Sequence, residues 1–382
     1  MSLYMDHSAT SWPKPEMVYE KINDYLRYNG ASPGRGGHKK SVAAGRLVEQ
    51  TRKDLANFFN IEDSSRLVFS SNATEAINIC LKGILNSGDH VIISSMEHNS
   101  VLRPLWALCQ KGIELSIIEC SQNGELDPQK VKSQIKSNTR LICVLHSSNV
   151  TGTILPIKEI GNVAKEHEIL FMLDTAQTAG VIPIDVIEFN LDILTFTGHK
   201  GLLGLQGTGG FYLRSGVEIR SWLEGGTGSA SESHAQPEEM PDKFESGTAN
   251  TPGIVGLGAG VRFIEEVGLE KIQKHEESLI EALIIGLKDI ENVILYGPLD
   301  PTRQSAVLSF NIKNVDCSVV SHLLDNVYDI SCRAGLHCAP LAHKTIGTFP
   351  SGSCRLSPGY FHTLEDINKV VGAIFDIEKM YR

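Results

Sequence analysis

The amino-acid sequence of 382 residues predicts an α/β fold with a mostly parallel central sheet and a smaller C-terminal α+β domain. Two observations lead to this prediction. Between residues 66 and 198, short apolar runs alternate with segments of helical apolar spacing, which is typical of parallel strands covered by helices. A stretch rich in Gly, Ser and Glu at 225–253 interrupts this pattern, and longer helices follow it. We therefore expect a large α/β domain at 20–255 and a small domain formed by 1–19 and 256–382.

Six strands are expected in the large domain, because six apolar runs are short and end in small or polar residues. They are RLVFSS (66–71), HVIISS (90–95), LSIIEC (115–120), RLICVLHSS (140–148), ILFMLD (169–174) and DILTFTG (192–198). Helical spacing predicts a helix at 156–167. The C-terminal part is expected to hold long helices within 254–292, a strand in AVLSFNI (306–312) and a terminal helix near 364–381.

The composition argues against several classes of function. A net charge of −10 without a block of Lys and Arg argues against a nucleic-acid partner. The N-terminus has no basic segment followed by an apolar core, and no apolar run reaches about 18 residues, so we expect a cytoplasmic protein without a membrane span. The eight cysteines are scattered without a CxxC pair, which favours reduced thiols over disulfides.

Asp174 and Lys200 are the two residues from which we predict a bound cofactor. Each lies at or just beyond the end of a strand-like run, so both side chains should lie at the carboxyl edge of the sheet. Pyridoxal phosphate needs an amine that forms a Schiff base with its aldehyde and a carboxylate that keeps its pyridine nitrogen protonated. Taken alone, the pair is better explained as a helix cap and a solvated lysine. The neighbouring motifs favour the cofactor.

Further polar motifs follow other strands. SNATEAIN (71–78) opens a helix whose free N–H groups can cradle a phosphate, although its Asn and Glu also fit a capping box. His98 can lie flat against an aromatic ring or act as a structural hydrogen-bonding residue. Asn149 and Gln177 can reach a phenolic oxygen on the ring, or simply form a turn and a helix start. Each motif is weak alone, but their shared place at strand ends indicates one ligand site.

Eight motifs resemble, in order and spacing, those of a known family: YMDHSATS, SNATEAIN, MEHNS, HSSNVTG, DTAQTAG, FTGHKG, ESGTANT and RAGLHCA. They are similar to the class V aminotransferase superfamily, and specifically to its cysteine desulfurase and selenocysteine lyase-like branch. The resemblance covers essentially the whole chain, and FTGHK together with RAGLHCA is a highly specific pair. It implies a transferase of fold type I that depends on pyridoxal phosphate and works as a homodimer.

The resemblance also implies a role for each matching residue. Lys200 would hold the cofactor covalently, Asp174 would pair with its pyridine nitrogen, and His98 would stack on its ring. The phenolic oxygen would be contacted by Asn149 and Gln177. The phosphate would be held by Ala73, Thr74, Thr197 and His199, and by Gly247 and Thr248 of the other subunit.

Cys338 distinguishes a desulfurase from its relatives. Its thiolate would take the substrate sulfur as a persulfide, L-alanine would leave, and a sulfur acceptor would be needed to reset the enzyme. The alternative is a buried structural thiol. Arg355 matches the arginine that clamps the substrate α-carboxylate in this family, together with Asn149, because a guanidinium fork fits a carboxylate. The alternative for Arg355 is an ordinary surface arginine.

Two positions depart from the family pattern. His7 stands where the family has Asn, and Leu336 replaces the first His of a Gly-His-His-Cys run, so His7 and His337 receive no role. Arg35 and His38 lie near the family's entrance motif, but their Gly-rich segment fits a structural loop equally well.

Two further interpretations concern metal and turnover. Five residues of types that can bind a metal lie within 332–354: Cys332, His337, Cys338, His343 and Cys354. Their spacings match no common zinc pattern, so no metal is predicted. The predicted reaction converts L-cysteine to L-alanine, with L-selenocysteine as a further substrate. The alternatives are another class V enzyme, either an aminotransferase or a C–S lyase, and a non-catalytic sulfur carrier or scaffold.

Overall fold

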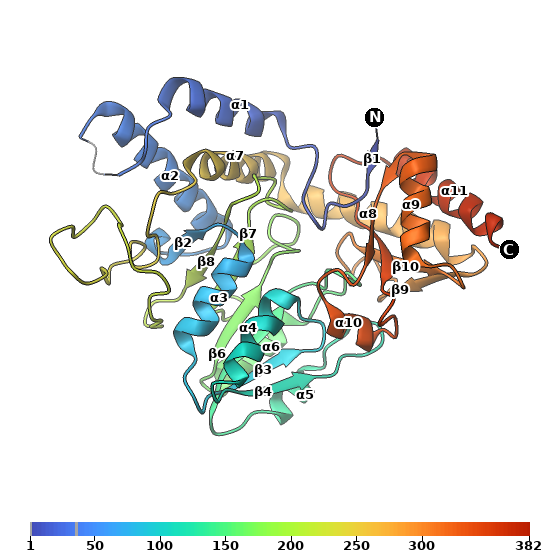
Figure 1. Cartoon of the computed structure of the whole chain (residues 1–382), viewed down its shortest axis with the longest axis horizontal. Helices are drawn as coiled ribbons and strands as arrows, with labels where there is room; N and C mark the ends of the chain where they lie inside the picture. The colour runs from blue at the N-terminus through green and yellow to red at the C-terminus, as the bar shows by residue number, and fades with distance from the viewer. Residues whose placement is uncertain (1, 35–36) are drawn as a thin grey trace.

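The computed structural model describes residues 2–34 and 37–382 (Figure 1), so Arg35 lies outside the described residues. Its main sheet has seven strands in the order β2-β8-β7-β6-β5-β3-β4. Their bounds are β2 (Leu67–Ser70), β3 (His90–Ser94), β4 (Glu114–Ile118), β5 (Thr139–Leu145), β6 (Leu170–Asp174), β7 (Ile193–Thr197) and β8 (Gly209–Leu213). All six strands expected from the sequence are present, and the neighbours β4, β3, β5, β6 and β7 pair in parallel, which confirms a mostly parallel sheet.

Strand β8 was not expected, and it is antiparallel to both of its neighbours, β2 and β7. It returns directly after β7 through the loop at 198–208, without a crossover helix. Two glycines explain its weak sequence signal. A Cβ atom at Gly209 would lie 2.7 Å from the Asn72 Cα, and one at Gly210 would collide with the Phe196 ring, so this strand requires residues that strands usually avoid.

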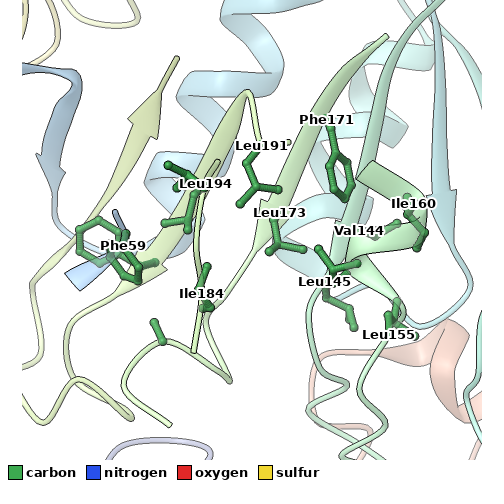
Figure 2. Packing of buried hydrophobic residues seen from close by; sticks show 14 of the residues in the cluster. Phe59, Val144, Leu145, Leu155, Ile160, Phe171, Leu173, Ile184, Leu191 and Leu194 are labelled. Atoms are coloured by element: carbon green, nitrogen blue, oxygen red, sulfur yellow. The ribbon is translucent and has the colours of Figure 1, made fainter. Parts of the chain in front are cut away.

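Helices cover both faces of the main sheet. One face packs on α3 (Ala73–Ile84) and α4 (Asn99–Cys109), through side chains such as Ile93 and Met172. The other face packs on α2 (Lys39–Phe58), α5 (Pro128–Ser133), α6 (Ile157–Glu166) and α7 (Thr251–Val267). Figure 2 shows this second core around Val144, Leu173 and Leu194, which belong to three adjacent strands. Two buried faces make the parallel strands continuously apolar, which is why the sequence revealed them.

The C-terminal part has its own antiparallel sheet in the order β12-β13-β10-β9. Its strands are β9 (Val293–Tyr296), β10 (Leu308–Ile312), β12 (Arg333–Gly335) and β13 (Ser353–Leu356). They share a separate apolar core with α8 (Leu269–Lys288), α9 (Cys317–Tyr328) and α11 (Leu364–Met380), while α10 (Pro340–Thr345) lies beside the main core. The expected long helices, the AVLSFNI strand and the terminal helix are thus all present. Thr363 and Asp366 start α11 with a capping box.

The N-terminal segment runs from one core to the other. Strand β1 (Leu3–Tyr4) pairs in parallel with β11 (Ile330–Ser331), beside α9 in Figure 1. Helix α1 (Glu16–Asp24) instead packs on α7, and the short helical segments η1 (Tyr25–Asn29) and η2 (Ser64–Arg66) flank α2. The domain boundary near residue 255 stays a prediction. Within the described residues, no helix is both long enough and apolar enough to cross a membrane.

Candidate active site

A pocket opens at the carboxyl edge of the main sheet. Nine residues predicted from the sequence line it: Ala73, Thr74, His98, Asn149, Asp174, Gln177, Thr197, His199 and Lys200. They come from the ends of β3, β5, β6 and β7 and from the start of α3. The pocket therefore brings together side chains that are far apart in the sequence, as parallel strands with a common carboxyl edge require.

Close packing of two glycines brings the Asp174 loop against the Lys200 loop. A Cβ atom added at Gly201 would lie 2.5 Å from the Ala179 carbonyl oxygen, and one at Gly180 would collide with Gly201. Gly180 also has φ of +90°, a conformation that favours glycine. Since neither position accommodates a side chain, the backbones touch and the lysine stays beside the aspartate.

Lys200 and Asp174 have the electrostatic properties that a lysine-bound cofactor requires. Burial, together with the positive charge of Arg355, lowers the pKa of Lys200 to about 8, so the free amine is available near neutral pH. Burial raises the pKa of Asp174, whose Oδ1 accepts a hydrogen bond from the Ala176 amide at 2.9 Å. An ionised carboxylate in this position needs a cationic partner, and a protonated pyridine nitrogen fits that need.

The start of α3 supplies the phosphate end of the pocket. Asn72 caps the helix by accepting from the Glu75 amide at 2.9 Å, while the Glu75 carboxylate accepts from the Ser71 amide at 2.6 Å. Asn72 and Glu75 therefore do form caps, which was the alternative interpretation of SNATEAIN, and the N-terminal turn also lines the pocket. His199 lines the same pocket, and its buried Nδ1 has no hydrogen-bond partner among the described residues. Free helix N–H groups and an unpaired imidazole nitrogen suit a phosphate.

His98 and Asn149 lie in the same pocket with part of their hydrogen-bonding capacity used. His98 Nδ1 accepts from the Ser100 amide at 3.1 Å, so the neutral ring carries its proton on Nε2. Burial and the charge of Lys200 lower the pKa of His98 to about 4, which keeps it neutral. The Asn149 amide nitrogen donates to the His337 carbonyl at 2.7 Å, but its Oδ1 is buried without a partner in the described part of the chain. That unpaired oxygen is a second group that a bound ligand would satisfy.

Cys338 is the only exposed thiol among the eight cysteines, all of which are described and free. This exposure removes the alternative of a buried structural thiol. Its loop is unusual, because His337 and Cys338 have φ of 48° and 57°, a region that residues other than glycine rarely adopt. The Cys338 carbonyl accepts from the Asn99 amide at 2.8 Å, which ties the loop to the start of α4, next to His98.

Arg355 is buried in β13 rather than at the surface, which contradicts the alternative of an ordinary surface arginine. Its guanidinium donates to Asp6 Oδ1 at 2.7 Å and to the Asn149 carbonyl at 3.0 Å, while its Nε is buried and has no partner within 2–34 and 37–382. Asp6 Oδ2 accepts from Arg333 Nε at 3.0 Å. Sequence reasoning missed Asp6, although it lies within YMDHSATS, because its partners lie more than 320 residues away.

The other predicted residues lie elsewhere. Gly247 and Thr248 line a separate surface pocket with Trp222 and Leu223, and not the pocket of Lys200. His38 caps α2 by accepting from the Ser41 amide at 3.2 Å. The ring of His7 packs on that of His362, with centroids 5.0 Å apart, and burial lowers its pKa to about 3.

No group of three or more His, Cys, Asp or Glu residues is arranged to hold a metal within 2–34 and 37–382. The cluster at 332–354 is instead engaged in local hydrogen bonds. His337 Nε2 lies 3.0 Å from the Ser353 carbonyl, and His343 Nδ1 lies 2.6 Å from the Thr348 hydroxyl.

Fold and site together define a class: α/β enzymes in which a lysine and a buried aspartate meet at the carboxyl edge of the sheet, beside a helix that can cradle a phosphate. The model of the family described as Aminotransferase class-V matches residues 3–370. The chain belongs to the class V aminotransferase family, whose members use pyridoxal phosphate, and this confirms the predicted family, fold type and cofactor.

Relatives and solved structures add detail. The chain is 34% identical to a probable cysteine desulfurase of Methanothermobacter thermautotrophicus, covering 99% of this chain and 95% of the relative. It is also 34% identical to a cysteine desulfurase of Yersinia pestis, covering 99% and 94%. The structure of a cysteine desulfurase from Thermococcus onnurineus is similar, with a TM-score of 0.93, 32% identity, and coverage of 99% and 95%.

Proposed function

We propose that this protein is a pyridoxal-phosphate-dependent cysteine desulfurase, which converts L-cysteine to L-alanine and leaves the sulfur as a persulfide on Cys338. One observation carries the proposal: an exposed thiol on a backbone-strained loop is tied to the rim of a pocket that holds Lys200 beside Asp174. Full-length similarity to relatives named cysteine desulfurase supports it. We propose L-selenocysteine as a further substrate of the same site, because selenium is a better leaving group than sulfur.

In this proposal the pocket residues hold the cofactor. Lys200 would bind it covalently, Asp174 would face its pyridine nitrogen, and His98 would lie against its ring. The phenolic oxygen would be contacted by Asn149 and Gln177, and the phosphate by Ala73, Thr74, Thr197 and His199. When bound, pyridoxal phosphate withdraws electrons from the substrate and so weakens its carbon–sulfur bond.

The substrate end of the site would be formed by Arg355 and Asn149. The unpaired Nε of Arg355 and the unpaired Oδ1 of Asn149 are buried groups that a substrate carboxylate and a substrate donor would satisfy. Asp6 holds Arg355 in place from the other side at 2.7 Å. Cys338 would then receive the substrate sulfur at its exposed thiol, and a sulfur-acceptor molecule would remove it from the same open position.

We further propose a cytoplasmic homodimer. Trp222 and Leu223 are 43% and 53% exposed around the pocket that contains Gly247 and Thr248. Large exposed apolar side chains at the rim of a pocket are typical of an interface. Covering them with a second subunit would allow Gly247 and Thr248 to reach the partner's phosphate site. Free thiols at all eight cysteines support a reducing compartment.

The purified protein is to be incubated with L-cysteine, and alanine and sulfide measured with and without a reductant. We expect alanine in both cases, sulfide release that depends on the reductant, and an added sulfur mass on the peptide of Cys338. Cys338→Ala should keep the visible absorbance of bound cofactor and lose sulfur release, while Cys109→Ala should behave as wild type. Sulfur release that survives in Cys338→Ala would refute persulfide formation there and favour a C–S lyase. An absorbance that does not respond to cysteine would favour a scaffold.

A further inference from the structure

The N-terminal segment lies directly against the backbone that carries Lys200. The carbonyl of His199 accepts from the Ser11 amide at 3.0 Å, from the Thr10 hydroxyl at 3.1 Å and from the Lys14 ammonium at 2.9 Å. The Ser11 hydroxyl also donates to the Lys200 carbonyl at 2.9 Å, and Lys14 Nζ donates to the same hydroxyl oxygen at 2.6 Å. Several donors thus converge on one peptide unit, which is the unit immediately before the lysine of the active site.

Lys14 is the charged member of this group. It forms no ion pair with Asp or Glu among the described residues, and its ammonium is satisfied by the Ser11 hydroxyl and the His199 carbonyl. Burial lowers the pKa of Lys14 to about 8, because the charged ammonium loses part of its hydration in this position. A surface lysine without such contacts would extend into water, so the position is specified by the hydrogen bonds.

The same segment is anchored at its other end to the substrate arginine. Asp6 binds Arg355 at 2.7 Å and Arg333 at 3.0 Å, and the His7 amide donates to the Ser357 carbonyl at 3.0 Å. Between the two anchors, the Ser8 carbonyl accepts from Gln177 at 3.2 Å. Residues 6–14 therefore connect the arginines of β12 and β13 with the lysine loop after β7.

We propose that Lys14 is a positioning residue, whose ammonium holds the His199–Lys200 peptide in the orientation that points the Lys200 amine into the pocket. This inference rests on the proposed function, since it assumes that Lys200 binds pyridoxal phosphate. Lys14 itself does not enter the pocket and acts through the backbone. Loss of its charge leaves the His199 carbonyl with neutral donors only, and these hold it less strongly.

The test compares the holoenzyme with Lys14→Met, Lys14→Arg and, as a control, Lys21→Met, which changes an exposed lysine of α1. We expect Lys14→Met to weaken pyridoxal phosphate retention by about tenfold, as the loss of a hydrogen bond from a charged donor implies. Amide hydrogen exchange in the cofactor-free protein should increase in the peptide containing 199–204 and not throughout the chain. Lys14→Arg should restore most of both properties, and Lys21→Met should change neither.

Two results would overturn the role of Lys14. One is unchanged retention and unchanged exchange in Lys14→Met, and the other is faster exchange throughout the chain, which indicates a general structural role. Ser11→Ala removes the hydroxyl that Lys14 contacts without removing a charge, and it should produce a smaller local change of the same kind. Borohydride reduction of the wild-type holoenzyme separates this test from that of the function. If no cofactor mass is found on Lys200, the proposed function fails independently of Lys14.

Discussion

Glu276 makes the pH dependence of stability testable. This carboxyl lies on α8 with 9% of its residue surface exposed, in a cavity that also contains Lys200 and His7. No Lys or Arg forms an ion pair with it within the described residues. Burial raises the pKa of Glu276 from 4.5 to about 8, although an amide of Tyr360 opposes this shift by hydrogen bonding. Glu276 is therefore protonated in the folded protein at neutral pH.

The free-energy effect follows from the two pKa values. Below its ordinary pKa, Glu276 is protonated in both folded and unfolded chains and has no pH-dependent effect. Between 4.5 and about 8 the unfolded chain loses this proton while the folded chain keeps it, so stability falls as pH rises. At about 1.36 kcal/mol for each pKa unit, the loss is about 3 kcal/mol at neutral pH and about 5 kcal/mol above the folded pKa.

Glu276→Gln removes this titration and keeps the side-chain shape. Unfolding entropy of about 2.1 cal/mol/K per residue, multiplied by 382 residues, gives about 0.8 kcal/mol/K, so 5 kcal/mol corresponds to about 6 °C. The Tm of the variant relative to wild type should therefore rise by about 5 °C between about pH 5 and about pH 9, when both are measured by calorimetry as holoenzymes. Any fixed cost of the buried amide shifts the variant equally at every pH.

Glu281→Gln, an exposed position on the same helix, is the matched control and should show no such rise. Lys200 contributes equally to wild type and variant, and so its titration cancels in the difference. Parallel Tm curves for wild type and Glu276→Gln across this range would refute a protonated Glu276 in the folded protein.

Three further substitutions have defined outcomes. Gly201→Ala should abolish cofactor absorbance while the chain stays folded by circular dichroism, because its Cβ would lie 2.5 Å from the Ala179 carbonyl; unchanged absorbance would contradict the role of this close contact. Asp174→Asn should retain the cofactor mass but lower kcat on the order of 100-fold, because its neutral amide stabilises positive charge poorly, and a near-normal kcat would count against the pairing. Asp6→Ala should lower the free energy of unfolding by about 3 kcal/mol in urea titrations, since it leaves the buried Arg355 charge without its carboxylate. A decrease below about 1 kcal/mol would show that the pair contributes little to stability.

The strands of the main sheet were predictable from sequence because burial on both faces makes each one a continuous apolar run. Strand β8 was not, because Gly209 and Gly210 are selected by close contacts with Asn72 and Phe196, which come from distant parts of the chain. Glu276 did leave a signal that was overlooked. It lies four residues after Ile272 and four before Ile280, within the apolar stripe of α8, where a charged residue is out of place.

The residues of the candidate active site also fall into two groups, those that could be predicted from the sequence and those that could not. Asp174, Lys200 and Asn149 were found because each lies at or just beyond the end of a recognisable strand, and parallel strands end at one edge. Asp6 and Lys14 were not found, because their importance comes from contacts with Arg355 and with the His199 carbonyl. A short segment of Asp, Ser and Pro residues has no periodicity from which such contacts could be deduced.

The N-terminal segment is consequently the part of the site in which geometry adds most to the sequence. Its anchors differ in kind: Asp6 holds two arginines of the C-terminal sheet, whereas Lys14 and Ser11 hold the backbone beside Lys200. Any movement of one core relative to the other must stretch residues 6–14 or break one anchor. Because Asp6 and Arg355 are both buried while Lys14 is only partly buried, the contact at Lys14 should yield first. The position of Lys200 would then respond to the state of Arg355, the arginine proposed above to bind the substrate.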